Sequence, residues 1–363
     1  MNKIYNTSHV LLLTAILLLA AACSSDSSND VQPSPNTPNT SQEISLIPTV
    51  WQMMEGTRAA FYEGGNITSS FTVAAYSANT TTAYISPVAV NYVTDKWSFS
   101  DGKHYWPASG NLDFFAYMPA EKPNYITSEP TYSVQSSTPQ ASFTCANIPM
   151  TYNATDPTAG QGSSLQEFIW GITIGQNKTN QGESGVTMKF RHPFARLRFQ
   201  LAASHPDIII NSITFKNLKT GGTCTLNNTD IDATYYYKTS EWSDLTGSSN
   251  LVMTLAGKDS DGNWIAASVN TFNSNPSSVV PIGGWGGEPA THQYIDLLVI
   301  PQTFAGEIEV NAGWNDWGDT PVAHTVSKTI SAITWQPGKT YTYTLTISTD
   351  DLTVDINSYT EQW

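Results

Sequence analysis

Apolar and polar residues alternate in short runs along most of the chain. Residues 195–201 show the pattern best, because Ala195, Leu197, Phe199 and Leu201 are apolar and polar residues stand between them. A period of two is typical of β-strands with one buried face. Runs of this kind predict further strands at 43–50, 70–76, 112–117, 168–174, 186–192, 208–215, 294–300, 308–310, 340–347 and 352–356.

These runs form two blocks that are separated by turn residues and contain no helical crossover. Roughly a dozen short strands arranged in this way indicate antiparallel sandwiches rather than a mixed α/β sheet. We therefore predict an all-β protein with two β-sandwich domains in tandem. The N-terminal sandwich is predicted over residues 44–186 and the C-terminal sandwich over residues 187–363.

A different pattern occupies the N-terminus. Lys3 is followed by the almost unbroken apolar run Val10–Ala22, which has the layout of a signal peptide and is too short to span a bilayer comfortably. The run ends in three alanines before Cys23, which favours a lipoprotein signal over residues 1–22 and lipidation of Cys23. The alternative is an ordinary alanine-rich cleavage site with an incidental cysteine.

Residues 23–43 are rich in Ser, Asn, Pro and Thr and predict a disordered tether. The stretch 24–30 resembles the Ser/acidic tract that directs some lipoproteins to the outer face of the outer membrane. Several acyl chains anchor a protein stably where one does not. We therefore expect an outer-membrane lipoprotein held at the cell surface by its N-terminal lipid.

Composition narrows the possible partners. Charged residues make up 13% of the chain and the formal net charge is −14, which argues against nucleic acid as a partner. Beyond Cys23 there are two cysteines, Cys145 and Cys224, one in each predicted sandwich. They are either joined in a disulfide or remain as two buried thiols.

Sequence patterns of catalysis and metal binding are missing. The histidines form no HxH, HxxxH or HExxH pair, and the chain has no GxSxG, GxGxxG or P-loop motif. Residues 259–262 begin like a calcium loop but lack the closing Glu, so a hairpin turn is preferred. His192 is predicted to be a core histidine that hydrogen-bonds to backbone. We expect no cofactor, no metal and no enzymatic activity.

Four groups of residues, in order along the chain, resemble the fimbrillin family, the type V pilins of anaerobic Gram-negative bacteria. They are 105–107 with 112–119, then 190–197, then 297–303, and finally 335–343 with the terminal Trp363. The resemblance implies two transthyretin-like sandwiches in tandem. It also implies export as a lipoprotein, followed by cleavage after an arginine of the first domain.

The position that matches this cleavage site is Arg58-Ala59, although an ordinary connecting loop with an arginine is the alternative. Cleavage there would release the lipid together with the predicted strand at 44–50, and a strand from another pilin subunit would replace it. The candidate donor is the C-terminal segment, where Leu352, Val354 and Ile356 alternate with polar residues. The same alternation would also let this strand close its own domain. Stalk, tip and anchor subunits share these motifs.

A surface glycan-binding lipoprotein is the second hypothesis. It would use aromatic side chains as sugar platforms, and it would bind a host or bacterial surface ligand without polymerising. The candidate platforms are Trp264, Trp285, Trp314, Trp317 and residues 235–237.

Overall fold

The computed structural model is built almost wholly of β-strands. It describes residues 42–50, 67, 69–153, 160–162, 165–181, 185–203, 209–227, 240–258, 264–266, 295–314, 322–348 and 351–362. Within these ranges the helical element is the single turn α1, Lys178–Gln181, and no helix is long and apolar enough to cross a membrane. The predicted all-β class is confirmed.

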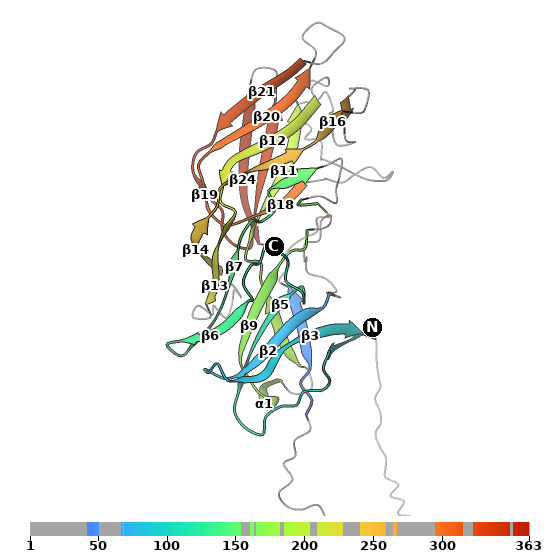
Figure 1. Ribbon diagram of the computed structural model, residues 1–363, viewed down its shortest axis with the longest axis vertical. Coiled ribbons are helices and arrows are strands. Elements are labelled where there is room, and N and C mark those ends of the chain that lie inside the picture. The colour runs from blue at the N-terminus through green and yellow to red at the C-terminus, as the bar shows by residue number, and fades with distance from the viewer. Residues whose placement is uncertain are drawn as a thin grey trace, which may run out of the picture. The chain divides into compact units, whose positions relative to one another are not determined.

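Five strands from the first half of the chain form an antiparallel sheet in the order β4-β3-β2-β5-β9 (Figure 1). Its strands are β2 (Phe71–Ser77), β3 (Ala83–Val93), β4 (Lys96–Phe99), β5 (Leu112–Met118) and β9 (Ile169–Gln176). All seven side chains of β5 are buried, which fits a nearly continuous apolar run in the sheet interior.

The charged member of β5, Asp113, is buried but well supplied with hydrogen-bond donors. Its carboxylate accepts from the Tyr132 hydroxyl at 3.0 Å, from the Asn79 amide at 2.9 Å and from the Gly175 amide at 2.8 Å. Three donors compensate the loss of water around the carboxylate. Asp113 thus links β5 to the turns and strands beside it.

Two further sheets enclose the core of the C-terminal half. One has the order β18-β11-β23-β24 and the other β21-β20-β12-β15-β8. The first contains β11 (Ala195–Ala203), β18 (Ile295–Val299), β23 (Lys339–Ile347) and β24 (Leu352–Gln362). The second contains β8 (Thr151–Asn153), β12 (Ile209–Leu218), β15 (Ser249–Thr254), β20 (Glu307–Trp314) and β21 (Val322–Thr329).

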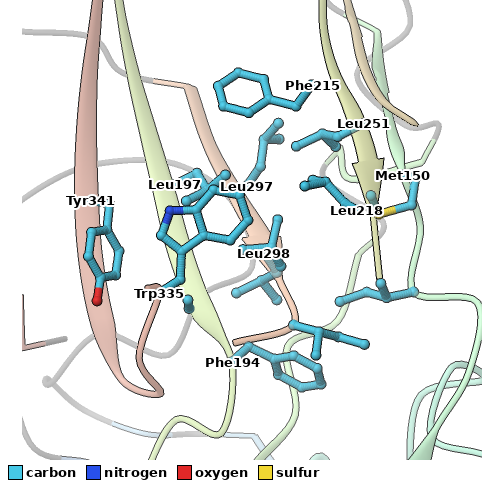
Figure 2. Close-up of a cluster of buried hydrophobic side chains, with 14 of the residues drawn as sticks. Met150, Phe194, Leu197, Phe215, Leu218, Leu251, Leu297, Leu298, Trp335 and Tyr341 are labelled. Atoms are coloured by element: carbon cyan, nitrogen blue, oxygen red, sulfur yellow. The ribbon is translucent and has the colours of Figure 1, made fainter. Parts of the chain in front are cut away.

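These two sheets face each other through aromatic contacts. Phe215 of β12 lies with its ring centroid 5.3 Å from Phe199 of β11 and 5.3 Å from Tyr343 of β23. Figure 2 shows the same core with Trp335 among Leu197 and neighbouring leucines. The apolar face of β11 therefore lies in this core, while Arg196 and Arg198 on its other face are also buried and Arg198 pairs with Asp296 at 2.8 Å.

A fourth sheet joins strands from both sides of the predicted boundary at 186/187, in the order β14-β13-β7-β6. Its strands are β6 (Thr131–Gln135), β7 (Thr138–Cys145), β13 (Gly221–Asn227) and β14 (Ser240–Thr246). Three two-stranded sheets complete the described list: β1 (Leu46–Val50) with β10 (Val186–Phe190), β16 (Ala256–Lys258) with β17 (Trp264–Ala266), and β19 (Thr303–Phe304) with β22 (Ile333–Thr334). The tandem-domain boundaries and the transthyretin-like topology stay predictions.

Most neighbouring strands are antiparallel, as predicted, but three pairs in the described residues are parallel. They are β11 with β23, β15 with β8, and β1 with β10. Alternation along one strand gives no information about the direction of its neighbour, so these pairs could not be predicted.

Candidate functional site

The strand β1 is attached to the fold along a short ladder. It forms a two-stranded parallel sheet with β10, with Leu46 opposite Val186 and Val50 opposite Phe190. The Val186 amide donates to the Ser45 carbonyl at 2.8 Å. Just before β1, the Ile44 amide donates to the His104 carbonyl at 2.8 Å. We call two groups of residues the β1 seat: residues 104–106, which pair with residues 42–44 just before β1, and residues 185–190, which pair with residues 45–50.

Side chains of this segment alternate between the core and the surface. Ile44 and Leu46 are 2% and 4% exposed, and Pro48 is buried, whereas Ile47 is 40% exposed. Ile44 and Leu46 join a cluster with Phe71, Phe114, Trp106, Val186, Met188 and Phe190. A fully buried Leu or Ile contributes ~1.5–3 kcal/mol, so these side chains supply most of the attachment.

A salt bridge marks the start of the strand. Lys103 Nζ lies 2.6 Å from Glu43 Oε2, and the hydrogen bond to Glu43 raises the pKa of Lys103. Both side chains are exposed to solvent, so the pair contributes little to stability. Glu43 itself bridges to Tyr105 in antiparallel register, which fixes the position of the acidic side chain beside Lys103.

The backbone at Gly185 lies very close to Ser45, the residue just before β1. Gly185 has φ +84°, and a Cβ there would lie 2.5 Å from Ser45 Oγ. Glycine adopts this backbone conformation without a steric penalty and leaves room for the neighbouring side chain. The β1 seat therefore requires glycine at this position.

The candidate donor strand, β24, pairs with a strand of its own chain in this structure. β24 lies at the edge of its sheet and pairs antiparallel with β23, with Leu352 opposite Ile347. Leu352 is buried, and Val354 and Ile356 are partly buried against the larger core cluster. This arrangement is the self-closing alternative, and the donor role of these three residues stays a prediction.

Several predicted site residues lie outside the described residues. They are Cys23, Arg58, Ala59 and Trp363. The proposed sugar platforms add no evidence either, because the structure describes the side chain of none of them. Lipidation, cleavage after Arg58 and glycan binding are therefore untested by the geometry.

His192 is buried, as predicted, and a carboxylate that the sequence did not point to is among its partners. Its Nδ1 lies 2.5 Å from Glu167 Oε1, and both side chains are almost inaccessible to solvent. The sequence predicted a backbone partner, because nothing in it links Glu167 to His192. No group of three or more His, Cys, Asp or Glu side chains suited to a metal ion occurs in the described part of the chain.

Cys145 and Cys224 are free and buried, which answers the question that the sequence left open. They lie on adjacent strands, since Cys145 of β7 is opposite Gly222 of β13. Burial raises the pKa of the Cys145 thiol to about 12, and it also raises the pKa of Cys224. Neither thiol is set up as a nucleophile, because the thiolate is the reactive form.

Sequence reasoning found β1 but missed the residues that hold it. Lys103, Tyr105 and Gly185 come from two separate turns, and their contacts with the strand depend on tertiary structure. A glycine directly before the predicted strand at 186–192 was the one available signal. The resulting site is a short, edge-held strand with alternating buried side chains and no catalytic groups around it.

Comparison with known proteins gives a family and related folds. The model of the fimbrillin-like family matches residues 57–363. A cell adhesion protein candidate from Bacteroides ovatus has 15% identity and a TM-score of 0.48, over 89% of this chain and 98% of that chain. A fimbrial protein from Bacteroides vulgatus has 15% identity and a TM-score of 0.45, over 89% of this chain and 100% of that chain. A search of curated proteins found no significant match.

Proposed function

The chain belongs to the fimbrillin-like family, and we propose that it is a structural or adhesive subunit of surface fimbriae that polymerises by donor-strand addition. Its family makes it a structural protein rather than an enzyme. In the proposed pathway the precursor is exported as a lipoprotein, is cut after Arg58, loses β1 and accepts a strand from another subunit.

The attachment of β1 carries this proposal. The strand ends at Val50 and the next strand among the described residues, β2, begins at Phe71, so Arg58 falls between them in the sequence. A cut after Arg58 would leave the segment 42–50 without a covalent link to the rest of the fold, and its described contacts are a few buried side chains, short backbone ladders and an exposed salt bridge. Its departure would expose apolar side chains and unpaired backbone groups, which are what an added strand satisfies.

Export and anchoring rest on the N-terminal sequence. The apolar run Val10–Ala22 and the alanines before Cys23 support lipidation at that cysteine. The same cut would free the subunit from the membrane, because the lipid and β1 lie on the same N-terminal fragment. Anchoring and assembly would thus be controlled by one proteolytic event.

The experiment treats the precursor, residues 24–363, with trypsin at low dose and follows it by N-terminal sequencing and native gels. We expect an early cut that gives an Ala59 terminus, followed by a ladder of oligomers. Arg58→Gln is the matched control, because it removes the cut and should leave the precursor monomeric. A cut precursor that loses β1 yet stays monomeric would refute donor-strand assembly.

A further inference from the structure

The C-terminal segment repeats the residue pattern of the segment that occupies the β1 seat. Residues 43–50 read Glu-Ile-Ser-Leu-Ile-Pro-Thr-Val, and residues 351–358 read Asp-Leu-Thr-Val-Asp-Ile-Asn-Ser. Both begin with an acid that is followed by an aliphatic residue, a hydroxyl residue and a second aliphatic residue. The three buried positions of the first segment correspond to three apolar residues in the second.

Only one register places these three apolar residues correctly. In the segment that the β1 seat holds, the buried side chains are those of Ile44, Leu46 and Pro48. A shift of one residue turns every side chain to the opposite face, so only even shifts compete. With a shift of two toward the C-terminus, Ser358 would take the buried position of Pro48.

The opposite shift of two is worse. It would place Asp350 at the position of Ile44, which is 2% exposed. Burying a carboxylate without a partner is far more costly than burying a serine. The apolar pockets therefore exclude the Asp350 register strongly, and they disfavour the Ser358 register by roughly the ~1.5–3 kcal/mol of one aliphatic side chain left unburied.

The charge of Lys103 also favours one of the two remaining registers over the other. Lys103 Nζ lies 2.6 Å from Glu43 Oε2, so the seat presents a cation beside the first position of the strand. In the register that fills all three apolar positions, Asp351 stands at this point. In the competing register it is Thr353, which has no charge.

We propose that the donor strand from a second copy of this chain enters with Asp351 in the place of Glu43 and Leu352 in the place of Ile44, a register set by the three apolar positions and reinforced by Lys103. This inference rests on the proposed function. The backbone is compatible with it, since residues 350–358 contain no proline. The donor even supplies an N–H at the position of Pro48, which has none to contribute to a ladder.

Cysteine pairs test the register. Residues 43 and 105 are directly opposed, so Tyr105→Cys combined with Asp351→Cys should link neighbouring copies of the cut protein under mild oxidation. Tyr105→Cys with Thr353→Cys and Tyr105→Cys with Thr349→Cys report the two shifted registers. Tyr105→Cys with Glu43→Cys in the uncut precursor is the geometric control, and it should link within one chain.

Charge exchange tests the role of Lys103. Lys103→Asp and Asp351→Lys should each slow the assembly of cut protein about 2- to 5-fold, the range of an exposed ion pair, and the double variant should recover. Polymers that link through Thr353→Cys or Thr349→Cys would overturn the proposed register while leaving strand addition intact. Assembly rates that do not change in Lys103→Asp and Asp351→Lys would overturn the contribution of Lys103 in the same way. Cut wild-type protein that forms no polymer would refute the proposed function and this inference with it.

Discussion

Two neighbouring substitutions in β1 should have very different effects. Leu46 and Ile47 are adjacent aliphatic residues, but Leu46 is 4% exposed and Ile47 is 40% exposed. Replacing a buried Leu by Ala costs about 2–5 kcal/mol, because the transfer energy is lost and a cavity remains. Ile47→Ala should stay near ~0.5 kcal/mol, as surface substitutions do.

Hydrogen exchange at Val186 measures this difference locally. The Val186 amide donates to the Ser45 carbonyl at 2.8 Å, so it exchanges only when β1 opens. A loss of about 2–5 kcal/mol raises the opening equilibrium by roughly 30-fold to several thousand-fold. The amide of Leu255, which donates to the Asn211 carbonyl at 2.8 Å, serves as a distant reference.

We expect Leu46→Ala to accelerate exchange at Val186 strongly while the exchange of Leu255 changes little. Ile47→Ala should leave both rates close to those of the wild type. Equal effects of the two substitutions would show that the alternation of buried and exposed side chains does not hold β1. A Val186 amide that is unaffected by Leu46→Ala would show that β1 opens only with the whole fold.

Three further predictions concern stability. Gly185→Ala should lower the free energy of unfolding by about 1–3 kcal/mol in urea titrations, since φ is +84° and the new Cβ would meet Ser45 Oγ at 2.5 Å. Asp113→Asn should cost about 1.5–3 kcal/mol in thermal unfolding, more than Tyr132→Phe, because three donors lose a charged acceptor. Burial raises the pKa of Cys145 from 9.0 to about 12, so the unfolded chain loses this proton first. Stability should therefore fall from about pH 9 upward, and less so in Cys145→Ala.

Strand positions were predictable where large aliphatic residues alternate. β11 and β10 appear where the sequence placed them, and β1 begins at Leu46 within the predicted run at 43–50. β7 was missed although its burial alternates along all eight residues. Its buried face is formed partly by Pro139 and Ala141, which are too small or too unusual in strands to give a clear signal.

The candidate site was predictable only in part, for a different reason. Alternation in one segment reveals a buried face, but it does not reveal what lies opposite. Glu43 and Lys103 are 60 residues apart, and their contact depends on the turn that returns residues 104–106 to the start of β1. The seat is a property of tertiary structure, whereas the strand it holds is a property of local sequence.

The pairing of β11 with β23 has a consequence for the order in which the chain folds. Arg196 donates from Nε to Thr340 Oγ1 at 2.9 Å across 144 residues of sequence, and β24 then adds to β23 at the sheet edge. Such non-local pairs slow folding, because a long loop must close before any contact compensates its entropy. During synthesis this sheet cannot be completed until β23 and β24, Lys339–Ile347 and Leu352–Gln362, have been made. Until then the apolar face of β11 lacks its β23 neighbour, and β24 is among the last elements to find a partner.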